Sequence, residues 1–187
     1  MEQILRDMIA LTGLEQQDYD ILQLSHSYTQ QWVEEFTQVF YETLYGYEST
    51  AKVFREGERP HREETLRRWY LEVTSGICDD PFWQRQWIIG LVHVPRRVTD
   101  PFMIGMMSRV QQLFLDKCLH EPGMAQPGRV YLAFKRVTDV ITGLIAEGYF
   151  ISYVEATERM TGQNRSLTDR LVELEINRMV EEARAKL

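Results

Sequence analysis

The chain has 187 residues, 44% of them hydrophobic and 26% charged, which is the composition of one globular domain and excludes a disordered or collagen-like chain. Its net charge of −7 disfavours binding to DNA or to an anionic membrane surface, and no apolar run approaches the roughly 18 residues of a membrane span. With only two cysteines, Cys78 and Cys118, and no apolar signal sequence at the N-terminus, it is expected to be a cytoplasmic protein that binds neither nucleic acid nor membrane.

Apolar residues recur with helical period along nearly the whole chain. Their spacing predicts helices over residues 1–12, 16–31, 32–46, 48–55, 60–76, 82–94, 100–119 and 130–160. Gly13, Gly46 and Gly76 are placed to end helices, Asp100 followed by a proline is a typical helix start, and Pro95 is expected to break the helix that precedes it. Since alternation with period two never persists, the predicted fold is all-α.

The segment 130–160 is apolar on two faces. Val130, Phe134, Val137, Ile141, Leu144 and Ile145 form one face, and Tyr131, Val140, Ile151 and Val154 form a second. A helix that is apolar on two sides is buried on two sides. It is therefore predicted either as the central helix of the core or as a helix that a partner subunit covers.

The C-terminal residues form a separate predicted unit. Thr161 and Gly162 interrupt the helical pattern, so we expect a domain over residues 1–161 and a helical linker over 162–187. From Asn164 on, an imperfect heptad pattern carries Leu167, Leu171, Leu174, Met179, Ala183 and Leu187. The linker is expected either to lead to another domain or to pack back on the body as an amphipathic helix.

The common catalytic motifs are absent from the sequence, so no catalytic activity is expected in this chain itself. Among four histidines, His93 is the candidate metal ligand because it ends an apolar segment and shares a helix face with Ile89 and Gly90. A glycine within a helix costs about 1 kcal/mol relative to alanine, a cost that is offset if a flat ligand approaches the backbone there. The Ile89 carbonyl is placed to accept the Nδ1–H of His93, which leaves Nε2 for a metal. A histidine buried in the core without a ligand is the alternative.

Several segments, taken in order, carry a resemblance to a known family. One segment is Thr65–Trp69, and His93 follows Trp69 by 24 residues. The other segments are Phe40–Tyr41, Ser75–Gly76, Asp79–Asp80, Ile89–His93 and, in the last long helix, Glu147–Tyr149. With these segments, residues 1–160 resemble the haem domains of globin-coupled sensors and the related protoglobins.

The resemblance implies a globin fold with an extra N-terminal helix and one haem b (iron protoporphyrin IX) ligated by His93. It implies that Tyr41 lies on the opposite side of the haem and donates a hydrogen bond to dioxygen. The residues expected to bind the cofactor are His93, Tyr41, Phe54, Thr65, Leu66, Trp69, Ile89, Gly90, Met106, Met107 and Val110. Arg96 and Arg97 are expected either to meet the haem propionates or to be solvated turn residues, and Arg62 either enters the distal space or points to water.

The function that this resemblance implies is that of a haem-based sensor of a diatomic gas, O2 or else NO or CO. The signal would pass through a homodimeric bundle of the last two long helices and the C-terminal helix to an output module or a separate signalling partner. Two alternatives remain at this point. One is a stand-alone haem globin with redox activity, such as NO dioxygenation or peroxidase-like turnover, and the other is a haem-free globin-like signalling bundle.

Overall fold

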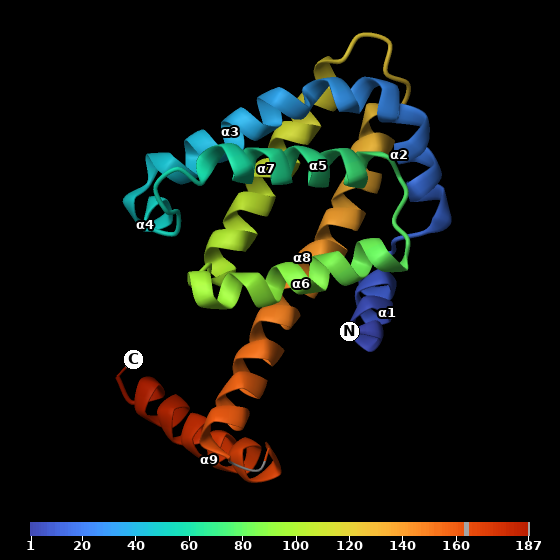
Figure 1. Ribbon diagram of the computed structural model, residues 1–187. Helices are drawn as coiled ribbons and strands as arrows, with labels where there is room; N and C mark the ends of the chain where they lie inside the picture. Colours follow the sequence, from blue (N-terminus) through green and yellow to red (C-terminus); the bar gives the residue numbers. More distant parts are fainter. Residues whose placement is uncertain (163–164, 187) are drawn as a thin grey trace. The chain divides into compact units, whose positions relative to one another are not determined.

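The computed structural model describes residues 1–162 and 165–186, and within these ranges it contains helices and no strand. The helices are α1 (Glu2–Thr12), α2 (Gln16–Thr29), the short 3-10 helix η1 (Gln30–Trp32), α3 (Val33–Gly46), α4 (Glu48–Ala51), α5 (Arg59–Thr74), α6 (Asp80–Arg96), α7 (Asp100–His120), α8 (Pro127–Thr161) and α9 (Arg165–Arg184) (Figure 1). The all-α prediction is confirmed.

The predictions for Pro95 and for the segment 48–55 differ from the structure. Pro95 does not break its helix, because α6 continues through it to Arg96. A proline in the last turn removes only one helical hydrogen bond, and the helix ends where Arg97 adopts a left-handed conformation with φ 57°. The segment 48–55 is helical only to Ala51, so Phe54 lies in the turn after α4, where its N–H donates to the Ala51 carbonyl.

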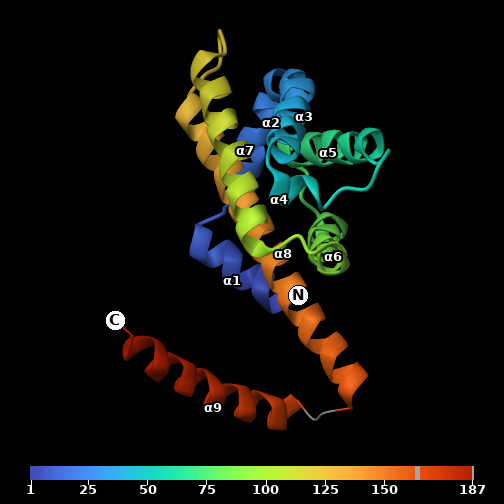
Figure 2. The same cartoon turned by 90° about the vertical axis from the view of Figure 1, so that its left-hand side faces the viewer.

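The chain divides into two compact units, Met1–Tyr149 and Phe150–Leu187. In the first unit, α3, α5 and α6 form one layer. The other layer consists of α7 and the part of α8 up to Tyr149 (Figures 1 and 2). The second unit contains the end of α8 and α9, whose Leu167, Leu171 and Leu174 are exposed. Asn164 and Leu187 of the predicted linker lie outside the described residues, and the predicted domain boundary after residue 161 stays a prediction.

Aromatic contacts around Phe114 lie at the centre of the core of the first unit. Phe114 of α7 stacks on Phe134 of α8 with ring centroids 3.7 Å apart, and Trp32 lies edge-on to Phe114 at 5.5 Å. Val140, which the sequence places on the second apolar face of α8, is fully buried within this chain. Over its first part, α8 is therefore the central helix of the core, one of the two predicted alternatives.

The helix α8 is also long and apolar enough to cross a membrane, by length and composition alone. However, several of its apolar side chains, among them Val137, Ile141 and Leu144, are buried in the core of the protein. The central helix of a globular protein has the same length and composition.

Candidate functional site

The start of α6 is fixed by its own sequence and by a contact with α5. The Asp79 side chain accepts the Phe82 N–H at 2.8 Å and so caps the helix. Gln86, which is fully buried, donates to the Phe82 carbonyl and accepts the indole N–H of Trp69 at 3.0 Å. Trp69, predicted to line the cofactor site, therefore ties α5 to α6 through its indole N–H.

Gly90 lies where α6 crosses α8, one turn before His93. A Cβ at Gly90 would lie 2.3 Å from the Ile145 carbonyl oxygen and 2.8 Å from the Tyr149 nitrogen, and Gly148 of α8 is packed in turn against the Trp87 carbonyl. The backbone of α8, rather than a flat ligand, is what approaches this glycine. This close contact fixes how α6 is shifted and rotated relative to α8, and it thereby fixes the position of His93.

His93 is half-buried near the end of α6, and its imidazole is uncharged at neutral pH. Its pKa is lowered to about 4, mainly by burial, and the nearby guanidinium groups of Arg62 and Arg96 contribute in the same direction. An uncharged imidazole is the form that binds a metal. Among the described residues, the His93 ring donates no hydrogen bond to the Ile89 carbonyl, and Ile89 itself is half-buried.

Tyr41 of α3 is 5% exposed and lies among aromatic rings. Its ring centroid is 5.3 Å from that of Phe40, 5.9 Å from Phe54 and 6.4 Å from Tyr45. Burial raises the pKa of the Tyr41 phenol, an effect that Arg62 opposes. The hydroxyl therefore remains protonated and is available as a hydrogen-bond donor in an apolar surrounding.

A cluster of three charged side chains lies beside His93. Both guanidinium NH2 nitrogens of Arg96 donate to Glu58 at 2.8 Å, a bidentate pair that joins the start of α5 to the end of α6. The Arg62 Nε lies 3.6 Å from Glu58 Oε2, and it is buried without a hydrogen-bond partner. Arg97 is exposed. We call Glu58, Arg62 and Arg96 the charged cluster.

The remaining predicted residues differ in burial. Val110 is buried, and Leu66, Met106 and Met107 are half-buried. Thr65 is exposed, and its hydroxyl donates to the His61 carbonyl of its own helix at 2.9 Å, as threonines in helices commonly do. The rings of Tyr41 and Phe54 are in contact, and the charge of Arg62 affects the pKa of both Tyr41 and His93. Among the described residues, Thr65 interacts with none of them.

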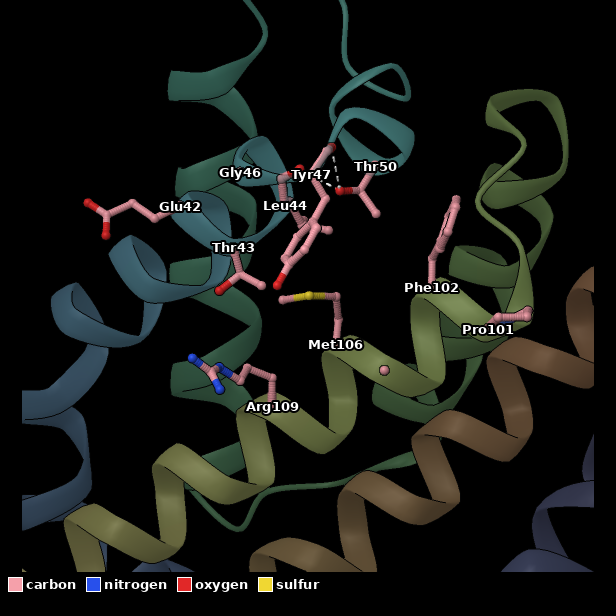
Figure 3. Close-up of a pocket in the computed structure, with 11 residues that line it drawn as sticks. Glu42, Thr43, Leu44, Gly46, Tyr47, Thr50, Pro101, Phe102, Met106 and Arg109 are labelled. Atoms are coloured by element: carbon pink, nitrogen blue, oxygen red, sulfur yellow. Dashed lines mark hydrogen bonds between the residues drawn. The ribbon is translucent and has the colours of Figure 1, made fainter.

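A groove of about 720 Å³ lies between the end of α3, α4 and the first half of α7. Figure 3 shows Tyr47 and Met106 pointing into it from opposite sides, with Arg109 at one end. Of the residues predicted to bind a cofactor, only Met106 lines this groove. It is therefore a separate feature from the group around His93 and Tyr41.

Sequence analysis did not find Glu58 or Gln86. Glu58 stands four residues before Arg62, a spacing that predicts an ion pair on a helix. Its stronger partner is Arg96, 38 residues away, and no local pattern indicates that contact. Gln86 appeared as a polar residue within an apolar segment, and a buried amide of this kind needs partners, but the sequence does not say which.

The residues around His93 fit a haem. Among the described residues, no three His, Cys, Asp or Glu side chains come together as a metal site, but a haem iron takes four ligands from the porphyrin and needs one from the protein. His93 supplies an uncharged imidazole, Tyr41 a protonated donor, and Arg62 a buried N–H without a partner, which suits an acidic group of the ligand.

Comparisons with known proteins give the family and the fold. A family model described as Protoglobin matches residues 1–155. Among solved structures, the globin domain of Geobacter sulfurreducens globin-coupled sensor is similar, with a TM-score of 0.70 and 18% sequence identity, covering 77% of this chain and 96% of that one. A comparison with curated proteins gave no match. The predicted globin fold is confirmed.

Proposed function

Since the chain belongs to the protoglobin family, we propose that it binds one haem b through His93 and senses a diatomic gas, O2 in the first place and NO or CO as the other candidates. The observation that carries this proposal is the match of the family model to residues 1–155, together with the place of His93 near the end of α6, one turn after the crossing at Gly90. Burial lowers the pKa of His93, which agrees with an uncharged imidazole.

When bound, the haem would supply a ferrous iron, which binds diatomic gases. The chain's own residues would then decide which gas is held. Tyr41 has a protonated phenol in a low-dielectric surrounding, so it stabilises a ligand that carries partial negative charge, as O2 does, more than it stabilises CO. Tyr45 and Phe54, whose rings lie 4.9 Å apart, pack against the Tyr41 ring.

We further propose that the signal leaves the haem domain through a homodimer and the C-terminal helix. The similar Geobacter protein is a globin-coupled sensor, and the exposed leucines of α9 support a helix that meets another surface. In this proposal residues 1–161 form the sensing domain, residues 162–187 form the linker, and the signal reaches an output module or a separate partner in the cytoplasm.

A hemin titration of the purified protein tests the proposal and separates it from its alternatives. The sensor predicts uptake of one hemin per chain, followed after reduction by a reversible O2 complex. Sustained consumption of NO and O2, or of peroxide, with an added electron donor would instead favour a redox globin. Failure to take up hemin would favour the haem-free bundle.

A further inference from the structure

The charged cluster has an unequal number of charges. Glu58 carries one negative charge, and Arg62 and Arg96 carry two positive charges. The Glu58 carboxylate accepts two hydrogen bonds from Arg96 at 2.8 Å. This bidentate contact is the main reason why the pKa of Glu58 falls to about 2. Arg62 is left with a buried Nε that donates to no acceptor. The cluster can therefore accept a further carboxylate.

The position of the cluster decides which carboxylate it can meet. Arg96 follows His93 by three residues in α6, a spacing that puts both side chains on one face of the helix, and Glu58 brings Arg62 of α5 to the same place. A ligand held at His93 therefore has both arginines nearby. Another acidic residue of α5, Glu63, forms ion pairs with Arg59 at 2.7 Å and with Arg67 at 3.7 Å. It therefore does not compete with a ligand for Arg62 and Arg96.

Arg62 and Arg96, we propose, form the site for the haem carboxylates, and Glu58 is a built-in competitor that occupies Arg96 when no haem is present. This inference rests on the proposed haem binding and adds to it. Seating the haem exchanges the Glu58–Arg96 pair for contacts between the propionates and the two arginines. The Glu58 carboxylate then returns to water, where an ionised carboxylate is well solvated.

Haem and its dimethyl ester, which lacks both negative charges, form the probe pair for this inference. The rate of haem loss to an excess of apomyoglobin is measured for the full chain with each of the two haems. The variants are Arg62→Gln, Arg96→Gln and Glu58→Gln. Glu72→Gln is the matched control, because Glu72 of α5 pairs with Arg85 of α6 at 3.4 Å, an ion pair between the same two helices that is not part of the cluster.

Each arginine variant is expected to lose haem about 10-fold faster, as the loss of a charge-assisted contact predicts. Glu58→Gln is expected to lose haem several-fold more slowly, because the competitor is gone. Loss of the ester is expected to change by less than about 2-fold in all of these variants. Because haem and ester are compared within one variant, any general weakening of the fold cancels from their ratio.

Two results would overturn the inference while leaving haem binding in place. The first is an equal effect of the arginine variants on haem and on its ester. The second is a Glu58→Gln protein whose ratio of haem loss to ester loss equals that of Glu72→Gln. If neither haem nor ester binds the unmodified protein, the proposed function itself fails, and the inference fails with it.

Discussion

Arg62 is the charged residue with the largest effect on both His93 and Tyr41. It favours the uncharged imidazole and opposes the burial that raises the pKa of the phenol. In both residues the outcome is the neutral form, which for an imidazole means a free ligand nitrogen and for a phenol means a donor. The neutral form of both groups therefore follows first from their burial, and Arg62 strengthens it at His93 and weakens it at Tyr41.

Tyr41→Phe tests the donor role of the phenol. The variant is expected to release O2 about 10- to 100-fold faster, since a buried hydrogen bond to a ligand with partial charge contributes about 1.5–3 kcal/mol. CO release is expected to change much less, because CO carries little charge. Stopped-flow measurements of both gases check this, and an equal change for O2 and CO would contradict the donor role.

The sequence predicted some members of the site and missed others for a physical reason. His93 stands out locally because it ends an apolar helical segment, and Tyr41 stands out through the resemblance. Glu58 lies just before the first turn of another helix, and its pairing with Arg96 exists only because α5 and α6 pack together. Side chains that meet across 38 residues leave no pattern in a single sequence.

At the scale of helices, the crossing of α6 and α8 determines where His93 lies. Gly90 and Gly148 let the two backbones approach so closely that a methyl group on either glycine would overlap the backbone of the other helix. Helix pairs with larger side chains at the contact usually lie about 8–10 Å apart. The glycines thus lose helix propensity but allow a close contact between α6 and α8.

Gly90→Ala is expected to destabilise the protein by about 1–3 kcal/mol, because the added methyl group overlaps the Ile145 carbonyl and the helices must separate. It is also expected to speed the loss of haem, since His93 shifts with α6. The matched control is Gly105→Ala in α7, where nothing lies within 4 Å of the new methyl group.

Gly105→Ala is expected to stabilise the protein by about 0.5–1 kcal/mol through helix propensity alone. Urea denaturation of the two variants gives both free energies of unfolding. A stabilised Gly90→Ala protein would show that the crossing does not require a glycine.

The helices themselves were largely predictable from the sequence, because apolar periodicity, glycine ends and aspartate–proline starts are local signals. Pro95 misled the prediction because its effect depends on how much of the helix follows it, and here only Arg96 does. The partner of Gly90 was not predictable. A glycine in a helix indicates that something comes close, whereas only the fold identifies the neighbour as α8.

At the scale of the whole molecule, the chain consists of two compact units, and the residues proposed to hold the haem belong to Met1–Tyr149. The charges and rings that act on His93 and Tyr41 all come from this first unit. Effects of changes at distant and independent places are usually additive and small. The sensing site is therefore expected to work without the C-terminal helix.

A chain that ends at Thr161 tests this separation of roles. Its O2 and CO affinities are expected to lie within about 2-fold of those of the full chain, because no contact of the site is removed. The proposed homodimer is expected to be weaker for this shortened chain, because the exposed leucines of α9 are lost. Gas titration and sedimentation measure the two properties, and a shortened chain with altered gas affinity and an unchanged dimer would reverse the assignment.

The absorption spectrum of the reduced protein under CO, recorded beside that of His93→Ala, is the most direct test of haem binding through His93. The unmodified protein is expected to give the sharp Soret band of a ferrous–CO haem b with one haem per chain, and the variant is expected to lose or weaken it. An unchanged spectrum and haem content in His93→Ala would contradict His93 as the ligand. A protein that takes up no added hemin would contradict haem binding altogether.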